Sequence, residues 1–358
     1  MAQGMTRDSV LSICGISKNQ FYYTLGNKKR GRKATRITRK KTITGEEDVK
    51  NDIVVNEIKS HLKDPLNKEG YRRMTGVLQL MGYYINHKKV YRLMRSNQLL
   101  CAPKAKVSKR YVKYRILSPE GPLRLLEIDI KYAWIDKMNR HAYILTIIDV
   151  FTRVVLYWNG AWHIKQKDVE NGWKQVIEEH LEPHEIYGWE IDIEVRSDNG
   201  PQFSAKKLKK YLADNYLMQT FTHPYTPQEN GHIESFHSIL GGYLEGQYFE
   251  SLEDLNNNLV VFYDHYNNNR VHGSTLNLPP QVFWEQWLQG NIERIVIDEN
   301  LRKVKFKLHI ARQDIIKIKP TGNMNQEVGL LLDLENPNHV KSEYYQTDGA
   351  VLIDQPSV

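Results

Sequence analysis

Three acidic side chains occupy places where a carboxylate can do chemistry. Asp129 lies inside the apolar run Leu125–Ile130, where a buried carboxylate needs a cation or a hydrogen-bond network. Asp198 directly follows the strand-like run Ile191–Ser197, and strand ends in α/β sheets are where ligands bind. Glu234 lies one turn into a helical pattern that has an apolar stripe. These three residues are the candidate catalytic and metal-binding residues.

The elements that must position these acids form a mixed α/β pattern over residues 121–290. Runs of β-branched and aromatic residues predict strands, and apolar residues spaced three and four apart predict helices. The predicted strands are Leu125–Ile130, Tyr143–Asp149, Arg153–Trp158, Ile191–Ser197 and Leu217–His223. The predicted helices are Lys165–His180, Ala205–Asn215, Glu229–Tyr248, 252–266 and 280–289.

Four other side chains near the acids have simpler explanations than metal binding. Glu127 shares the strand face of Asp129 by its spacing of two, which makes it a weaker competitor for metal. Asp149 precedes a predicted turn, and we interpret its carboxylate as a hydrogen-bond acceptor within that turn with an ion pair nearby. His232 and His237 flank Glu234, but hard cations disfavour imidazole, so we expect them to bind hydrogen-bond partners or phosphate.

Charge is unevenly distributed along the 358 residues, whose formal net charge is +8. Residues 1–115 contain 27 Lys and Arg against 8 Asp and Glu, whereas the remainder is net acidic. This division indicates a nucleic-acid partner for the first part and a cation-dependent function for the second. No apolar run approaches the roughly 20 residues of a membrane span, and Cys14 and Cys101 are too few for a disulfide framework. We therefore expect a cytoplasmic protein that uses no membrane.

The basic front third predicts two helical DNA-binding units joined by basic linkers. Residues 1–26 have the pattern of a helix-turn-helix broken at Gly15. Its predicted core is Val10, Leu11, Ile13, Ile16, Phe21 and Tyr22. Residues 27–45 hold nine Lys and Arg and no acid, so we expect a linker that stays mobile until it meets phosphate.

The second helical unit is predicted over residues 46–101, with a further basic linker over 102–120. Glu46, Glu47 and Asp48 are expected to open its first helix, which Pro65 ends. A solvated charged face on an ordinary bundle is the alternative for this unit. The predicted DNA contacts are Lys28, Lys29, Arg30, Arg32, Lys33, Arg36, Arg39, Lys40, Lys41, Arg72, Arg73, Lys88, Lys89, Arg92, Lys109 and Arg110.

Residues 291–358 contain short alternating runs that predict a small β-rich, barrel-like C-terminal domain. The predicted strands are Glu293–Asp298, Lys303–Ile310, Asp314–Lys319, Val328–Leu332 and Val351–Ile353. Lys303, Lys305 and Lys307 share one strand face, which either meets DNA or is solvated.

The acids and their flanking sequences resemble a known family. Asp129, Asp198 and Glu234 are separated by 68 and 35 residues, a spacing similar to the Asp, Asp, 35, Glu signature of integrase-type transposases. The flanking sequences Ile148–Arg153, Ser197–Phe203 and Pro224–His237 also resemble the family's core. Other resembling segments are Tyr266-Asn267 with Arg270, His272 and Pro279, and, before the core, Tyr71-Arg72-Arg73 and Val90–Met94. The resemblance covers roughly residues 48–285 and is to bacterial insertion-sequence transposases of the retroviral-integrase superfamily.

The resemblance implies a ribonuclease-H-like core that brings the three acids together across a sheet. Three carboxylates can hold two divalent cations, with Mg²⁺ preferred and Mn²⁺ as the substitute, for an in-line phosphoryl displacement. The implied activity is a DNA transposase that binds the terminal inverted repeats of its element, cleaves the ends and joins them to target DNA. Double-stranded DNA is the expected partner. Joining two ends requires a homodimer or larger assembly on DNA near the bacterial nucleoid, with a small companion protein as a further possibility.

Two other functions fit parts of the sequence. A sequence-specific repressor with a catalytically dead core would use the basic front third alone, although all three acids are present. A nuclease that hydrolyses DNA without joining it would share the metal site. Arg270 and His272 either contact phosphate or cap the domain.

Overall fold

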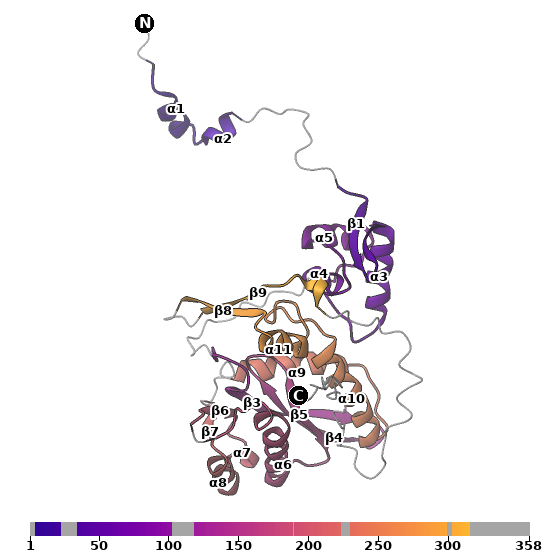
Figure 1. Ribbon diagram of the computed structural model, residues 1–358, viewed down its shortest axis with the longest axis vertical. Coiled ribbons are helices and arrows are strands. Elements are labelled where there is room, and N and C mark those ends of the chain that lie inside the picture. The colour runs from indigo at the N-terminus through magenta and orange to yellow at the C-terminus, as the bar shows by residue number, and fades with distance from the viewer. Residues whose placement is uncertain are drawn as a thin grey trace, which may run out of the picture. The chain divides into compact units, whose positions relative to one another are not determined.

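The chain divides into two compact units, residues 1–37 and 38–358, which are described separately. The computed structural model describes residues 4–22, 34–101, 118–188, 190–222, 230–298 and 303–315 (Figure 1). Among these, no helix is long and apolar enough to cross a membrane.

The first unit contains two short helices, as predicted. α1 (Arg7–Ile13) and α2 (Lys18–Phe21) are separated at Gly15, whose φ of 62° is in the left-handed region that favours glycine. The predicted core of this unit is wrong: Leu11 is buried, but the other five members are exposed, Ile13 by 71%. Helices of seven and four residues are too short to enclose a core of their own.

A hairpin replaces part of the predicted basic linker. β1 (Ile37–Thr42) and β2 (Gly45–Lys50) pair with each other, and the amide of Lys41 donates to the carbonyl of Gly82 at 2.8 Å. The prediction that residues 27–45 cannot pack is therefore wrong for residues 37–45, and residues 23–33 lie outside the described residues. Glu46, Glu47 and Asp48 lie on β2 and do not open a helix. The prediction failed because it considered only side-chain charge, whereas the backbone hydrogen bonds that pair these strands do not depend on the side chains.

Three helices follow the hairpin and share one apolar core. They are α3 (Asn51–Lys63), α4 (Tyr71–Leu80) and α5 (His87–Ser96), and α3 ends just before Pro65, as predicted. Fully buried side chains from each helix meet in this core: Ile58 from α3, Met74 and Leu78 from α4, and Val90 and Met94 from α5. The predicted second helical unit is thus helical from residue 51, with the turn between α4 and α5 closed by Asn86 as the N-cap of α5.

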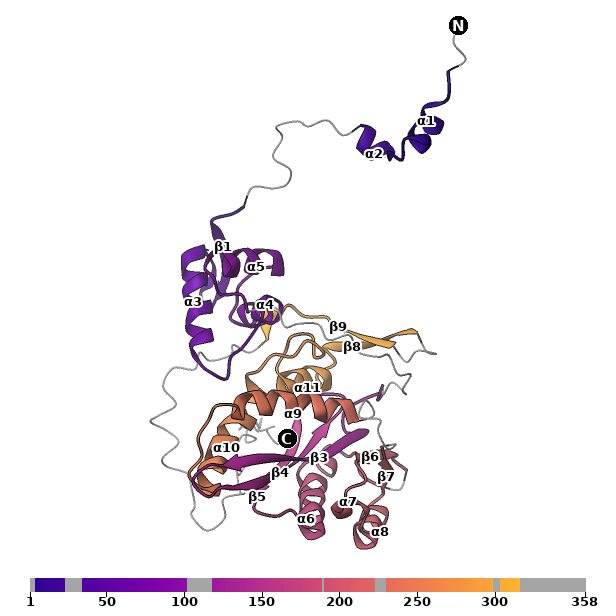
Figure 2. The same ribbon diagram turned by 180° about the vertical axis from the view of Figure 1, so that it is seen from behind.

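A five-stranded mixed sheet forms the centre of the larger part (Figure 2). The strand order is β5-β4-β3-β6-β7, in which β3, β4 and β5 are antiparallel whereas β6 and β7 run parallel to β3. The bounds are β3 Leu125–Ile135, β4 Arg140–Asp149, β5 Val155–Ala161, β6 Ile193–Ser197 and β7 Leu217–Phe221. All five strands were predicted, and this topology is the ribonuclease-H-like arrangement that the resemblance implies.

Helices cover both faces of this sheet, with α6 and α8 on one face and α9 on the other (Figures 1 and 2). On β3, Leu126 and Ile128 pack in the apolar cluster of α6 and α8, so Glu127 and Asp129 face α9. The helices are α6 Gln166–Val176 with a π-turn at Ile177–Leu181, α7 Pro201–Ser204, α8 Lys206–Asp214, α9 Gly231–Leu244, α10 Leu252–Asn268 and α11 Pro280–Leu288.

The described C-terminal region is a hairpin and one short turn. β8 (Ile292–Asp298) pairs with β9 (Lys303–Leu308), where side chains alternate between exposed and half-buried as predicted. Phe306 lies 5.3 Å from Phe151 and 5.1 Å from Phe283, ring centroid to ring centroid, so the hairpin packs on the core. Asp314 belongs to the 3-10 turn Arg312–Asp314 and not to a strand. Residues 316–358 lie outside the described residues, and the barrel-like domain stays a prediction.

A glycine on α4 allows close backbone contact with the loop before α11. A Cβ atom on Gly76 would lie 2.7 Å from the Cβ and 2.8 Å from the carbonyl oxygen of Asn277. Gly76→Ala is therefore expected to lower the free energy of unfolding by about 1–3 kcal/mol through overpacking, measured by urea denaturation. Gly242→Ala is the matched control, since that helical glycine has no neighbour within 4 Å of a built Cβ. Equal stability of Gly76→Ala and wild type would contradict the expected clash.

Candidate active site

Asp129 and Asp198 come together because they lie on adjacent parallel strands. The register pairs Leu125 with Glu194 and Glu127 with Arg196, and continuing it by two residues places Asp198 beside Asp129. Partial burial raises the pKa of Asp198, and the negative charge of Asp129 raises it further. The Gly200 amide, which donates to Asp198 Oδ1 at 2.9 Å, acts in the opposite direction. Two like charges at one sheet edge favour a cation between them.

Helix α9 brings Glu234 to the same face of the sheet. Nδ1 of His237 lies 3.3 Å from Oδ2 of Asp129, while the Ile130 amide donates to Oδ1 of Asp129 at 2.8 Å. Glu234 precedes His237 by three residues, and side chains three apart are neighbours on a helix surface. Glu234 is exposed on this helix. His237 thus lies within ion-pair distance of Asp129, and its hydrogen bonding stays a prediction.

The donor set suits a divalent cation through its oxygen chemistry. Asp129 and Asp198 offer carboxylate oxygens on neighbouring strands, and such oxygens are the ligands that Mg²⁺ prefers. Within the described ranges, however, no group of three or more His, Cys, Asp or Glu side chains is gathered closely enough to hold a metal ion. Glu234 thus lies near the pair without completing a three-ligand cluster.

Glu127 has a structural role that the sequence did not reveal. Its side chain is fully buried, and Oε2 accepts a hydrogen bond from the Ile233 amide in the first turn of α9 at 2.7 Å. Desolvation by burial raises the pKa of Glu127 to about 7, against the lowering effect of this hydrogen bond. The carboxyl group therefore fixes the start of the helix that carries Glu234. Its spacing of two from Asp129 indicated only that the two side chains share a strand face, and no local signal indicated the contact with Ile233.

Asp149 forms a turn, as predicted, whereas no salt bridge to its carboxylate is found among the described residues. Its carboxylate is fully buried and accepts hydrogen bonds from the amides of Leu123 (3.1 Å) and Thr152 (2.9 Å) and from the Thr152 hydroxyl (2.6 Å). Burial raises the pKa of Asp149, and these donors oppose the rise. The turn then places Arg153, with a φ of 70°, two residues before β5.

His232 and His272 are uncharged near neutral pH. Burial, followed by the positive charges of Arg153 and Arg196, lowers the pKa of His232 to about 3. Burial, and next the charge of Arg270, likewise lowers the pKa of His272 to about 3. Arg270 is buried, which lowers its pKa, and the negative charge of Glu69 acts in the opposite direction. This burial favours the domain-capping alternative for Arg270 over a phosphate contact.

The predicted DNA-binding residues fall into three groups. Some basic side chains have partners within the protein: Arg39 with Glu46 at 3.2 Å, Lys40 with Tyr83 at 3.3 Å, Lys41 with Asp314, and Arg73 with the Lys68 carbonyl at 3.2 Å. Others lie on the surface of the three-helix unit or its entry: Arg36, Lys88 and Arg92 are exposed, Lys89 is half-buried, and exposed Arg72 donates to the Tyr71 hydroxyl at 3.2 Å. The remainder lie outside the described residues: Lys28, Lys29, Arg30, Arg32, Lys33, Lys109 and Arg110.

Comparisons with known families match both structured parts of the chain. Family models described as an integrase core domain match residues 119–227 and 217–280, and one described as an HTH-like domain matches residues 51–107. Both Asp129 and Asp198 fall in the first match and Glu234 in the second.

Several curated proteins are similar to the chain over this region. A putative transposase InsK for insertion sequence element IS150 of Escherichia coli is 26% identical over 231 residues, which cover 61% of this chain and 77% of that protein. A transposase for IS904 of Lactococcus lactis is 23% identical and covers 66% of this chain and 95% of that protein. Among solved structures, the Mos1 transposase catalytic domain with raltegravir and Mg has a TM-score of 0.35, with 14% identity over 46% of this chain and 76% of that one.

The order of the matched domains agrees with the order of the folded parts. The HTH-like match covers α3, α4 and α5, and the integrase core matches cover the five-stranded sheet together with α9 and α10. The chain therefore carries an HTH-like domain followed by an integrase core domain, and over this region it is similar to bacterial insertion-sequence transposases.

Proposed function

We propose that the chain is a DNA transposase that binds the terminal inverted repeats of its element, cleaves the element ends and joins them to target DNA. The observation that supports this most is the placement of Asp129 and Asp198 on adjacent parallel strands beside α9, the helix with Glu234. An integrase core implies transfer at phosphodiester bonds, and carboxylates at one sheet edge are the groups such a transfer needs.

Each acid has its own role in this proposal. Asp129, Asp198 and Glu234 would hold two divalent cations, Mg²⁺ or in its place Mn²⁺, and His237 orients the Asp129 carboxylate. The bound cations supply Lewis-acid stabilisation of the charge that develops on the oxygens around phosphorus. Water attacks the phosphodiester at the element end and frees a 3′-hydroxyl, which then attacks a target phosphodiester and displaces a target 3′-hydroxyl. The side chains form no covalent intermediate.

DNA recognition is assigned to the basic front third. Exposed Lys88 and Arg92 on α5 suit phosphate contact, and α5 is the second helix of the α4–α5 pair. Because one active site treats one end at a time, joining two ends requires at least a dimer on DNA.

The decisive experiment is a joining assay with labelled inverted repeats taken from the DNA that flanks the gene. Wild type is incubated with the labelled ends and a supercoiled plasmid, with Mg²⁺ or with EDTA. We expect labelled plasmid with Mg²⁺ and none with EDTA, whereas DNA binding survives EDTA because Lys and Arg need no metal. Nicked plasmid without joined label would support the nuclease alternative, and specific binding without nicking or joining would support the repressor.

A further inference from the structure

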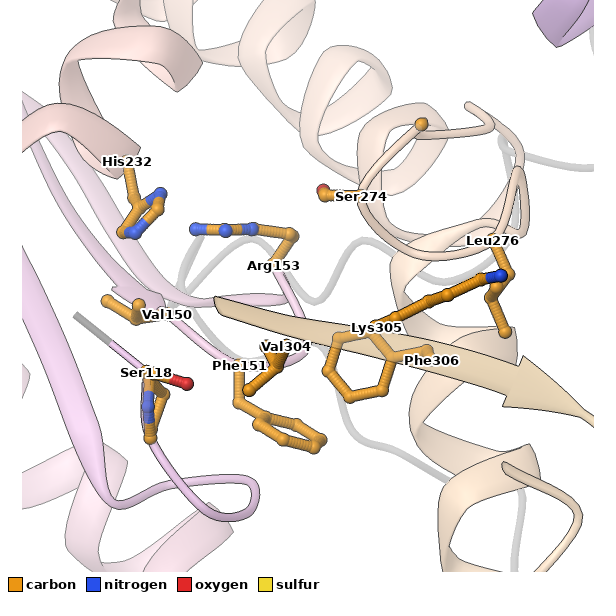
Figure 3. A pocket seen from close by; sticks show the side chains of 12 residues that line it. Ser118, Val150, Phe151, Arg153, His232, Ser274, Leu276, Val304, Lys305 and Phe306 are labelled. Atoms are coloured by element: carbon orange, nitrogen blue, oxygen red, sulfur yellow. The ribbon is translucent and has the colours of Figure 1, made fainter. Parts of the chain in front are cut away.

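A cavity of about 400 Å³ lies at the start of α9, beside the turn between β4 and β5. Its polar lining consists of Arg153, His232, Ser118, Ser274 and Lys305, and no acidic side chain of the described residues lines it. Figure 3 shows the Arg153 guanidinium extending from the turn toward His232 on α9. The remaining lining is apolar and includes Phe306 of β9. The cavity therefore combines positive charge with an apolar wall.

Arg153 lacks a complete set of partners. Its Nη1 is buried and has no hydrogen-bond partner in the described part of the chain. Burial lowers the pKa of Arg153, and the charges of Glu127 and Asp149 oppose this, but neither carboxylate lines the cavity or accepts from Nη1. An anion in the cavity would give Nη1 the partner that it lacks.

The backbone holds Arg153 in place for such a ligand. Its φ of 70° is uncommon outside glycine, and the buried Asp149 turn maintains it, with the Arg153 amide donating to the Asp149 carbonyl at 2.9 Å. The side chain is thus directed into the cavity by a turn that is built before any ligand arrives.

The size of the cavity indicates more than a bare phosphate. Sites for small organic ligands span roughly 300–1,000 Å³, so 400 Å³ accommodates a unit of nucleotide size. A guanidinium pairs with phosphate oxygens through parallel N–H donors, and aromatic side chains pack against bases. The chemistry of the lining therefore matches an anionic phosphate group attached to an apolar ring.

We propose that this cavity binds one nucleotide unit of a DNA strand, with its phosphate at Arg153 and Lys305 at the rim. The inference rests on the proposed function, because it takes the strand that reaches Glu234 to be DNA. His232 lies two residues before Glu234 on the same helix, so a nucleotide held here lies at the α9 end of the active site.

The test is the salt dependence of DNA affinity in the full-length protein. Fluorescence anisotropy with a labelled duplex is measured over a series of NaCl concentrations for wild type, Arg153→Gln, Lys305→Gln and Lys303→Gln. The slope of log K against log salt is negative, and each lost phosphate contact reduces its magnitude by about 0.9. We expect that loss for Arg153→Gln and Lys305→Gln but not for Lys303→Gln, a matched lysine on the same strand that does not line the cavity. Arg153→Lys, which keeps the charge, is expected to keep the wild-type slope.

The outcomes separate this inference from the proposed function. Wild-type slopes in both cavity variants overturn the nucleotide site while leaving the transposase proposal intact, whereas a wild type without DNA affinity overturns both. If Arg153→Gln fails to fold, Lys305→Gln against Lys303→Gln decides, because both lysines are exposed. Thermal unfolding of wild type and Arg153→Gln with inorganic phosphate or thymidine 5′-monophosphate tests whether the cavity binds a free ligand instead of DNA. If these ligands stabilise wild type but not Arg153→Gln, and the salt slope of DNA binding is the same in both proteins, the proposal is overturned.

Discussion

Asp198→Asn is expected to reduce strand joining by about 10³-fold or more while leaving DNA affinity at the wild-type value. The substitution keeps the size of the side chain but removes the negative charge beside Asp129. Metal-ion catalysis contributes several kcal/mol of transition-state stabilisation, and each 1.4 kcal/mol or so corresponds to a factor of ten in rate. The measurement is the initial rate of labelled plasmid formation at saturating end DNA, with anisotropy on the same DNA as the binding readout.

Asp192→Asn is the control for this variant. Asp192 is exposed just before β6, so the control makes the same chemical change one residue before the strand that Asp198 follows. The control is expected to join DNA at the wild-type rate. Joining by Asp198→Asn at that same rate would remove Asp198 from the catalytic mechanism.

Glu127→Ala is expected to raise the Mg²⁺ concentration needed for half-maximal joining by about 10–100-fold. Glu127 does not contact the reacting atoms; it is a positioning residue that acts through the Ile233 amide and thus through the α9 helix with Glu234. Groups that orient metal ligands typically change metal affinity or activity by that factor when they are removed. Loss of the acceptor also leaves a buried N–H unsatisfied, which costs about 1–3 kcal/mol of stability.

Glu127→Gln separates positioning from general stability. The glutamine side chain keeps a carbonyl oxygen that can accept from the Ile233 amide, so most of the wild-type metal requirement is expected to return. Titrations of joining rate against Mg²⁺ for the three proteins provide the comparison. A lower unfolding temperature in Glu127→Ala with an unchanged metal requirement would mean that Glu127 only supports the fold.

The sequence predicted the catalytic core well because its elements follow simple periodic patterns. The strand run that ends at Asp149 is largely apolar, and the run that ends at Ser197 alternates apolar with polar residues, so in both the pattern of burial predicts a strand. Asp129 was recognisable as a carboxylate in an apolar strand, and Asp149 as a turn residue.

The failures have a different physical origin. The hairpin of β1 and β2 is held by backbone ladders and by the partner carbonyl of Gly82, which charge composition does not record. The contact of Glu127 with Ile233 joins residues 106 apart along the chain. Local periodicity could predict the strand and the helix that contain them but not the contact between the two. In α1 and α2 the opposite error occurred: the apolar pattern predicted a core, but the unit is too small to bury these side chains.

The parallel pairing of β3 with β6 has a consequence for tolerance to insertions and deletions. The pairing fixes Asp198 beside Asp129 by strand register, whatever the length of chain that connects the two strands. Extra residues between α6 and β6, around Glu185, leave that register intact, whereas one residue added within Ile193–Ser197 turns Asp198 toward the opposite face. Relatives with a different separation between the two aspartates can therefore build the same site, and an alignment of strands identifies it better than a count of residues.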